Sequence, residues 1–241
     1  MKIFGHRGAA GEVDENTLAS VRVAIAAGAD GVEFDVRKCR DDLVVMHDVT
    51  VDRTTSGSGP VSAYKLANLR QLRTAGGEPI PTYTEVLRTL CGPRVVNIEL
   101  KEDNIVSATV ESVLSEIATD SETQFLFSSF PAHATAELAR CLALTPYHLG
   151  ILCDRDTMRA LADAERYRAW SVHFPLELVD SGTIEAAHAI NCSVYVYTVN
   201  ELQDYDRCQA RGADGIFTDY PTRMVAHRDK CDAEARSTRL G

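Results

Sequence analysis

The chain has no apolar run near the roughly 18 residues that a membrane span needs, and it has no block of basic residues. It carries 25 lysines and arginines against 35 aspartates and glutamates, a formal net charge of −10 at pH 7. A nucleic acid would approach this acidic protein against long-range repulsion, so we expect neither a nucleic-acid partner nor a membrane span. The hydrophobic fraction of 45% and the charged fraction of 25% also exclude a disordered or fibrous chain.

No CxxC pair is present, although the chain contains seven cysteines. An odd number of cysteines, scattered from Cys39 to Cys231, is typical of reduced thiols rather than of a disulfide framework. The first residues lead from Met1 directly into the sequence GHRG, without the apolar segment of a signal peptide. Both features predict a cytoplasmic protein.

Short β-branched runs alternate with amphipathic stretches along the whole chain. Eight of these runs are predicted as main strands, near residues 3, 32, 95, 124, 148, 171, 194 and 216, and each but the last is followed by a helical pattern. Eight β/α units in about 250 residues is the size of a TIM (β/α)8 barrel, so we predict a single barrel domain over residues 1–241. A doubly wound open sheet would alternate in the same way, but the GxGxxG loop that favours it is missing.

An internal repeat supports the β/α alternation. The segment GADGVEFD at 28–35 recurs as GADGIFTD at 212–219. In both copies a glycine ends a helical stretch, and a hydrophobic strand then ends at a carboxylate. We interpret the two copies as one αβ unit used twice.

Residues 51–80 interrupt the alternation. They contain the turn-forming sequence GSGP at 57–60, a short helical pattern at 64–72 and two glycines at 76–77. We interpret this segment as a small insertion between the second strand unit and its helix. Because barrel active sites lie at the carboxyl ends of the strands, the insertion is expected to cap the catalytic face.

Acidic side chains gather at the predicted strand ends. Glu33 and Asp35 are two apart in one strand and share a face, and Glu99 and Lys101 do the same in another. Three carboxylates aimed at one volume repel, and burying them unpaired costs on the order of several kcal/mol each. Oxygen-only ligands suit Mg²⁺ or Ca²⁺ rather than zinc, although a metal-free network with Lys101 and Arg7 would also neutralise them.

Two histidines, His6 and His47, stand at strand ends beside charged residues. Imidazole titrates near neutral pH, so one ring could accept a proton from a nucleophile while the other protonates a leaving group. Arg7 and Lys101 would add positive charge for an anion, as phosphoryl transfer requires. Of the other histidines, we interpret His133, His148, His188 and His227 as structural, and His173 as ambiguous.

The ordered motifs of the chain resemble those of the glycerophosphodiester phosphodiesterase family. The resemblance runs from residue 3 to about residue 221. It covers GHRG at 5–8, ENT at 15–17, GVEFDV at 31–36, HD at 47–48 with RTT at 53–55, ELK at 99–101, TVN at 198–200 and GIFTDYP at 215–221.

The resemblance implies a TIM barrel with a small insertion after the second strand unit. It implies hydrolysis of a small glycerophosphodiester to glycerol 3-phosphate and an alcohol such as choline or ethanolamine. It also implies site roles: Glu33, Asp35 and Glu99 as metal ligands, His6 and His47 as acid and base, and Arg7 and Lys101 as phosphate contacts.

The chain departs from the family pattern at Asp14, where a proline is usual, and at Tyr197, where a tryptophan is usual. We expect Tyr197 to form a wall of the substrate pocket, with an ordinary core position as the alternative. A lysophospholipase D-like lipid phosphodiesterase would use the same chemistry and would need an apolar rim on the 51–80 insertion. A non-catalytic phosphate-ligand binding barrel is the second rival. A sugar-phosphate isomerase-like barrel is the third, and it lacks its glycine-rich phosphate loop here.

Overall fold

Eight parallel strands form a closed barrel in the computed structural model, which describes residues 1–90, 92, 94–116 and 122–240. Around the barrel the strand order is β1-β9-β8-β7-β6-β5-β4-β2, and β1 pairs with both β9 and β2, which closes the sheet. This confirms the predicted TIM barrel and excludes the open doubly wound sheet. The barrel strands are β1 (Lys2–Gly5), β2 (Gly31–Lys38), β4 (Val95–Leu100), β5 (Gln124–Ser129), β6 (His148–Leu152), β7 (Ser171–Pro175), β8 (Ser193–Tyr197) and β9 (Gly215–Thr218).

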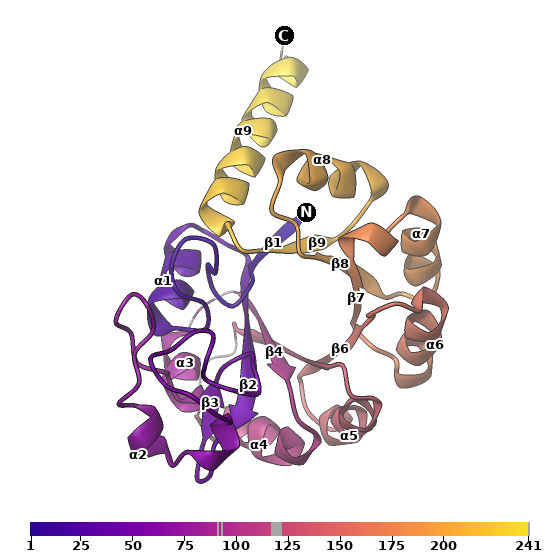
Figure 1. Cartoon of the computed structure of the whole chain (residues 1–241). Helices are drawn as coiled ribbons and strands as arrows, with labels where there is room; N and C mark the ends of the chain where they lie inside the picture. The colour runs from indigo at the N-terminus through magenta and orange to yellow at the C-terminus, as the bar shows by residue number, and fades with distance from the viewer. Residues whose placement is uncertain (91, 93, 117–121, 241) are drawn as a thin grey trace.

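Helices surround the barrel, and the last of them extends away from it toward the C-terminus (Figure 1). Thr17 and Thr82 each begin a helix with a capping box, in which the threonine side chain accepts a backbone N–H of the first turn. No helix among the described residues is both long and apolar enough to cross a membrane. The helices are α1 (Leu18–Ala26), α3 (Tyr83–Thr89), α4 (Val106–Glu116), α5 (Ala132–Leu142), α6 (Thr157–Tyr167), α7 (Ser181–Ala189), α8 (Leu202–Arg211) and α9 (Pro221–Leu240), with short 3-10 turns at Asp103–Ile105 and Leu176–Leu178.

Strand β3 (Leu43–Val45) pairs with β2 in an antiparallel hairpin beside the barrel, and residues 51–80 follow it. This segment contains a 3-10 turn at Val61–Ala63 and the helix α2 (Leu66–Leu69). The helical pattern predicted over 64–72 is therefore shortened, because the backbone of Tyr64 and Lys65 is extended and the helix begins only at Leu66, whose N–H donates to Asp41 Oδ1 at 2.8 Å. The segment packs against the neighbouring 39–46 stretch in a small hydrophobic core, which is formed by Cys39, Val44, Met46, Val51, Val61, Leu69 and Ile80.

The interior of the barrel is filled by aromatic and aliphatic side chains. The Phe4 ring centroid lies 4.8 Å from that of Tyr195 and 5.0 Å from that of Phe217, and Val95 and Leu126 complete this cluster. Such rings exclude water and close the barrel below its carboxyl end. The polar residues discussed below therefore lie over a packed floor and not along an open channel.

Gly8 brings the turn after β1 against the first helix. Its φ is +84°, its N–H donates to the Glu33 carbonyl, and a Cβ there would lie 2.3 Å from Ser20 Oγ and 2.6 Å from the Ser20 carbonyl carbon. Gly28 has a similar φ of +82°, but its Cβ would meet nothing closer than Val225 Cγ1 at 3.8 Å. The two glycines share the left-handed backbone and differ in the space around them.

We expect Gly8→Ala to destabilise the protein more than the matched control Gly28→Ala. The left-handed conformation costs an alanine about 1–2 kcal/mol, and overpacking against backbone adds about 1–3 kcal/mol at Gly8 only. Urea denaturation of both variants measures the free energies of unfolding. An equal loss in the two variants would contradict the close approach at Gly8.

Candidate active site

A cavity of about 250 Å³ lies at the carboxyl ends of the barrel strands. Seven of the eight residues singled out from the sequence line it, and the eighth, Asp35, contacts two of them, Arg7 and Lys101. The structure therefore brings all eight together from five separate segments. The full lining is His6, Arg7, Glu33, His47, Asn97, Glu99, Lys101, Phe130, Leu152, His173, Tyr197, Thr198 and Phe217.

Glu33, Asp35 and Glu99 form an acidic trio on two neighbouring strands. Glu33 and Asp35 project from β2, and Asp35 lies opposite Glu99 in the β2–β4 register. Each contributes an oxygen that lies within 4.8 Å of the other two, and their exposed fractions are 2%, 1% and 9%. Buried carboxylates at this spacing require positive charge nearby.

Two basic side chains neutralise part of this charge. Lys101 Nζ lies 3.1 Å from Asp35 Oδ1 and also contacts Glu99, while Arg7 Nε lies 3.5 Å from Asp35 Oδ2. Although burial acts to raise the pKa of Asp35, the charges of Lys101 and Arg7 lower it to about 2. Asp35 also accepts a hydrogen bond of 2.8 Å from Asn16 Nδ2. Asp35 is thus fully compensated by the chain itself.

Glu33 is not compensated in this way. Its Oε2 accepts the Arg7 N–H at 2.7 Å, but its buried Oε1 has no hydrogen-bond partner among the described residues. Burial and the neighbouring charge of Asp35 raise the pKa of Glu33 to about 8, and the same two causes raise the pKa of Glu99. The metal-free network accounts for Asp35 but leaves a buried carboxyl oxygen of Glu33 without a partner among the described residues. An oxygen-only donor set with one unpartnered member fits a hard divalent cation.

His6 is oriented by a carboxylate at the end of β9. Its Nδ1 donates to Asp219 Oδ1 at 2.7 Å, and its Nε2 lies 4.0 Å from Glu33 Oε2. Asp219 in turn accepts from Asn200 Nδ2 at 2.6 Å and donates its N–H to the Asn200 side-chain oxygen. Burial acts to lower the pKa of His6, but the hydrogen bond to Asp219 and the charge of Glu33 outweigh it and raise that pKa.

His47 is oriented by its chain neighbour. Its Nδ1 donates to Asp48 Oδ1 at 2.7 Å, and Arg53 donates to both oxygens of Asp48. Arg53 also binds Glu15, which accepts from Arg7 at 2.8 Å, so the 51–80 segment joins the same polar network. The pKa of His47 is lowered, mainly by burial, and the positive charges of Lys101 and Arg7 act in the same direction. The negative charge of Asp35 opposes them without reversing the shift.

Aromatic side chains form one wall of the cavity. The Tyr197 hydroxyl donates to the Cys153 carbonyl, and Tyr197 is among the residues that line the cavity. The Phe130 ring lies edge-on to Tyr197 at 6.4 Å, is 43% exposed, and has Lys101 Nζ 5.9 Å from its centroid. His173, ambiguous from the sequence, lies on the floor beside Phe217, where burial lowers its pKa to about 3. It is therefore neutral and unsuited to proton transfer.

Several residues of this network were given no role from the sequence. Asp48 is adjacent to His47, and Asp219 occupies the position of Asp35 in the internal repeat, so both carried a signal that could have been used. Arg53, Asn16 and Asn200 stand inside the recognised motifs. Phe130 has no such signal, because nothing in its local sequence indicates that it lies against Tyr197.

The fold and this cavity define the chain as a TIM-barrel enzyme that acts on phosphate esters. Residues 6–223 match the glycerophosphoryl diester phosphodiesterase family. The chain belongs to this family, which confirms the resemblance drawn from its motifs and the prediction of a phosphodiesterase.

Related proteins align with this chain over nearly their full length. A glycerophosphodiester phosphodiesterase of Caldanaerobacter subterraneus is 31% identical over 237 residues, which cover 92% of this chain and 96% of that protein. A second, from Bacillus altitudinis, is 30% identical and covers 95% and 98%.

Solved structures agree with this assignment. A phosphodiesterase of Oleispira antarctica in complex with the product sn-glycerol-3-phosphate superimposes with a TM-score of 0.84, at 26% identity, and the match covers 95% of this chain and 97% of that one. A glycerophosphodiester phosphodiesterase of Agrobacterium tumefaciens gives a TM-score of 0.80, also at 26% identity, over 94% of this chain and 99% of that one.

The uncompensated Glu33 gives the metal-free protein a characteristic pH dependence. A carboxyl whose pKa is raised on folding, here from 4.5 to about 8, stabilises the fold fully below pH 4.5 and loses that contribution as pH rises through 8. With chelator present, wild type should lose stability relative to Glu33→Gln between these pH values, by at most about 1.4 kcal/mol per pH unit. Denaturant unfolding at several pH values measures this difference.

Glu15→Gln serves as the opposite control. Its pKa is lowered by Arg53 and Arg7 despite burial, so its contribution is lost only below pH 4.5 and its difference from wild type should stay constant above that. Parallel curves for wild type and Glu33→Gln would contradict the proposed state of Glu33.

Proposed function

We propose that the chain hydrolyses glycerophosphodiesters to sn-glycerol 3-phosphate and an alcohol. One observation carries this proposal: an acidic trio, two carboxylate-oriented imidazoles and two cations all line or contact a single cavity. The substrate class is supported by the family and by the product sn-glycerol-3-phosphate in the Oleispira enzyme. These groups supply acid, base and positive charge, which cleavage of a phosphodiester needs.

We propose Glu33, Asp35 and Glu99 as the ligands of a divalent cation, Mg²⁺ or Ca²⁺. Three carboxylates with no nitrogen or sulfur ligand among them are the donor set of such hard ions. When bound, the ion supplies positive charge that stabilises the phosphoryl transition state. Its charge would also partner the free Oε1 of Glu33.

We propose different roles for the two histidines on the basis of their environments. The lowered pKa of His47 favours its neutral ring, which is proposed to accept the proton of the attacking oxygen. The raised pKa of His6 favours its protonated ring, which is proposed to donate a proton to the departing alkoxide. Asp48 and Asp219 each hold a ring through Nδ1, so Nε2 is the atom that transfers the proton. The attacking oxygen belongs to water or to the substrate's own 2-hydroxyl, and in the second case the alcohol leaves a cyclic phosphate that water then opens to glycerol 3-phosphate.

Arg7 and Lys101 are proposed to bind the phosphate oxygens. Both line the cavity, and the neighbouring carboxylates raise the pKa of each against the opposing effect of burial, so both stay charged. Tyr197 and Phe130 are proposed to form an aromatic wall beside the alcohol group. Such a surface suits a quaternary ammonium such as choline.

Residues 51–80 are proposed to brace His47 rather than to cover the substrate. Arg53 reaches Asp48 and Glu15, but no residue of the segment is among the described residues that line the cavity. Its large apolar side chains, Tyr64, Leu66, Leu69 and Leu72, pack into the small hydrophobic core that the segment shares with the 39–46 stretch. An apolar rim, which the lysophospholipase D-like alternative needs, is therefore not formed by these four side chains.

We expect His6→Ala and His47→Ala each to reduce turnover of glycerophosphocholine by roughly 10²–10⁴-fold, the usual contribution of a proton-transfer group. Turnover is measured as the release of glycerol 3-phosphate, once with Mg²⁺ or Ca²⁺ added and once with a chelator. His188→Ala is the matched control, because His188 is an exposed histidine paired with Asp214 away from the cavity. Wild-type turnover in both site variants would refute the roles, and no turnover by wild type on any diester would favour the phosphate-binding barrel.

Phe130→Ala tests the aromatic wall. An exposed cation–π contact is worth about 0.5–1 kcal/mol, so KM for glycerophosphocholine should rise about two- to fivefold. KM for bis(p-nitrophenyl) phosphate should stay unchanged, because that substrate has no ammonium group. Leu144→Ala, at a side chain that is 99% exposed, is the control. An equal rise for both substrates would show that the wall does not select the ammonium.

A further inference from the structure

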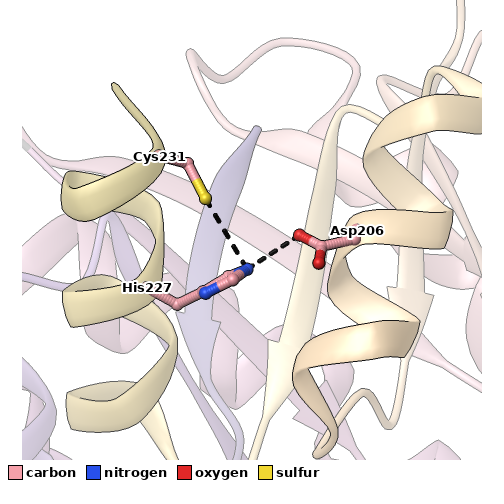
Figure 2. Close-up of side chains that lie close together, drawn as sticks. All are labelled: Asp206, His227 and Cys231. Atoms are coloured by element: carbon pink, nitrogen blue, oxygen red, sulfur yellow. Dashed lines mark hydrogen bonds and ion pairs between the residues drawn. The ribbon is translucent and has the colours of Figure 1, made fainter. Parts of the chain in front are cut away.

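A second cluster of ligand-type side chains lies outside the catalytic cavity, between α8 and α9 (Figure 2). Asp206 projects from α8, and His227 and Cys231 project from α9 at i and i+4, so the two share one face of that helix. His227 Nε2 lies 2.7 Å from Asp206 Oδ1 and 3.7 Å from Cys231 Sγ. Both α8 and α9 lie on the outside of the barrel (Figure 1).

The three side chains do not form a catalytic relay. In a Cys–His–Asp triad the carboxylate holds one ring nitrogen and the thiol is served by the other. Here the carboxylate and the thiol both approach Nε2, as the two dashed lines in Figure 2 show. One ring nitrogen cannot bond well to both at once. An oxygen, a nitrogen and a sulfur that all lie within 4.8 Å of one another are instead a donor set that could surround an ion.

We infer that Asp206, His227 and Cys231 bind a zinc-type divalent metal ion that joins α8 to α9. Nitrogen, thiolate and carboxylate together suit zinc, and a mixed set with sulfur argues against Mg²⁺ or Ca²⁺. The assignment is independent of the catalytic site, whose ligands are oxygen only.

The distances are close to those of a tetrahedral zinc site. Zn–N of about 2.0–2.1 Å and Zn–S of about 2.3 Å place nitrogen and sulfur about 3.5 Å apart, and nitrogen and oxygen about 3.3 Å apart. The nitrogen–sulfur distance of 3.7 Å already agrees, and the Asp206 oxygen has to withdraw by about half an ångström from its 2.7 Å contact. Asp206 has 56% of its side chain exposed and is free to do so. Water would complete the fourth position.

The His227 ring is already fixed for such a role. Tyr205, a fully buried residue of α8, packs edge-on against it, with the ring centroids 5.4 Å apart and an angle of 87° between the rings. His227 is 18% exposed, so the site is reachable from solvent while its ring is held. A metal ion here would clamp α9 to α8, next to the Arg228–Asp30 ion pair at 2.6 Å that already holds α9 to the barrel.

Cobalt(II) is the probe, because a thiolate ligand gives cobalt a near-ultraviolet charge-transfer band that oxygen ligands do not give. We expect this band in wild type and in the control Cys141→Ser, which removes another partly exposed thiol. It should be lost in Cys231→Ser and weakened in Asp206→Asn. Carrying out the titration in a Glu33→Gln background removes competition from the acidic trio. A band that persists in Cys231→Ser, or no band in wild type, would overturn the assignment.

Zinc itself is tested by protection of the thiol. A small molar excess of Zn²⁺ should slow alkylation of Cys231 several-fold and leave Cys141 unaffected, and His227→Ala should remove the protection. His188→Ala, which alters a histidine–carboxylate pair at 2.8 Å that has no thiol contact, should keep it. Equal alkylation rates of Cys231 with and without Zn²⁺ would contradict the site. Turnover should be unchanged in Cys231→Ser, which separates this test from the proposed function.

Discussion

The burial of three carboxylates on two adjacent parallel strands is the constraint on which the rest of the site depends. Glu33, Asp35 and Glu99 are held together by the β2–β4 register, so their mutual repulsion cannot be relieved by a side-chain rotation alone. Lys101 and Arg7 compensate Asp35, and Lys101 also contacts Glu99. They leave Glu33 Oε1 without a partner among the described residues, and this oxygen is the one that a further cation would contact.

The two histidines lie in different electrostatic surroundings. Burial acts to lower the pKa of both imidazoles. At His6 the hydrogen bond to Asp219 and the charge of Glu33 outweigh burial and raise the pKa, whereas at His47 the charges of Lys101 and Arg7 act together with burial and the pKa is lowered. The pKa values of two otherwise similar imidazole–carboxylate pairs are thereby shifted in opposite directions, which is the basis of the roles proposed for them.

The two clusters of ligand-type side chains differ in burial and in the atoms that they offer. The catalytic trio is buried, contains oxygen only and faces two cations of the chain, whereas the α8–α9 cluster is half-exposed and combines oxygen, nitrogen and sulfur. The different burial and donor atoms of the two clusters therefore predict different ions, a hard cation at the acidic trio and a zinc-type ion between α8 and α9.

The amino-acid sequence determined the β/α alternation, the closed barrel and the eight residues that meet at its carboxyl end, because strand ends and motif spacing are local properties. It did not determine the short helix in 51–80, where the extended backbone of Tyr64 and Lys65 and the contact of Leu66 with the distant Asp41 overrode the helical pattern. The tertiary structure alone decided which carboxylate serves which histidine, since Asp219 is 213 residues from His6 in the chain. It also decided that Phe130 meets Tyr197 and that Asp206 meets His227, because contacts between side chains of separate β/α units depend on how those units pack and leave no periodic trace in the sequence.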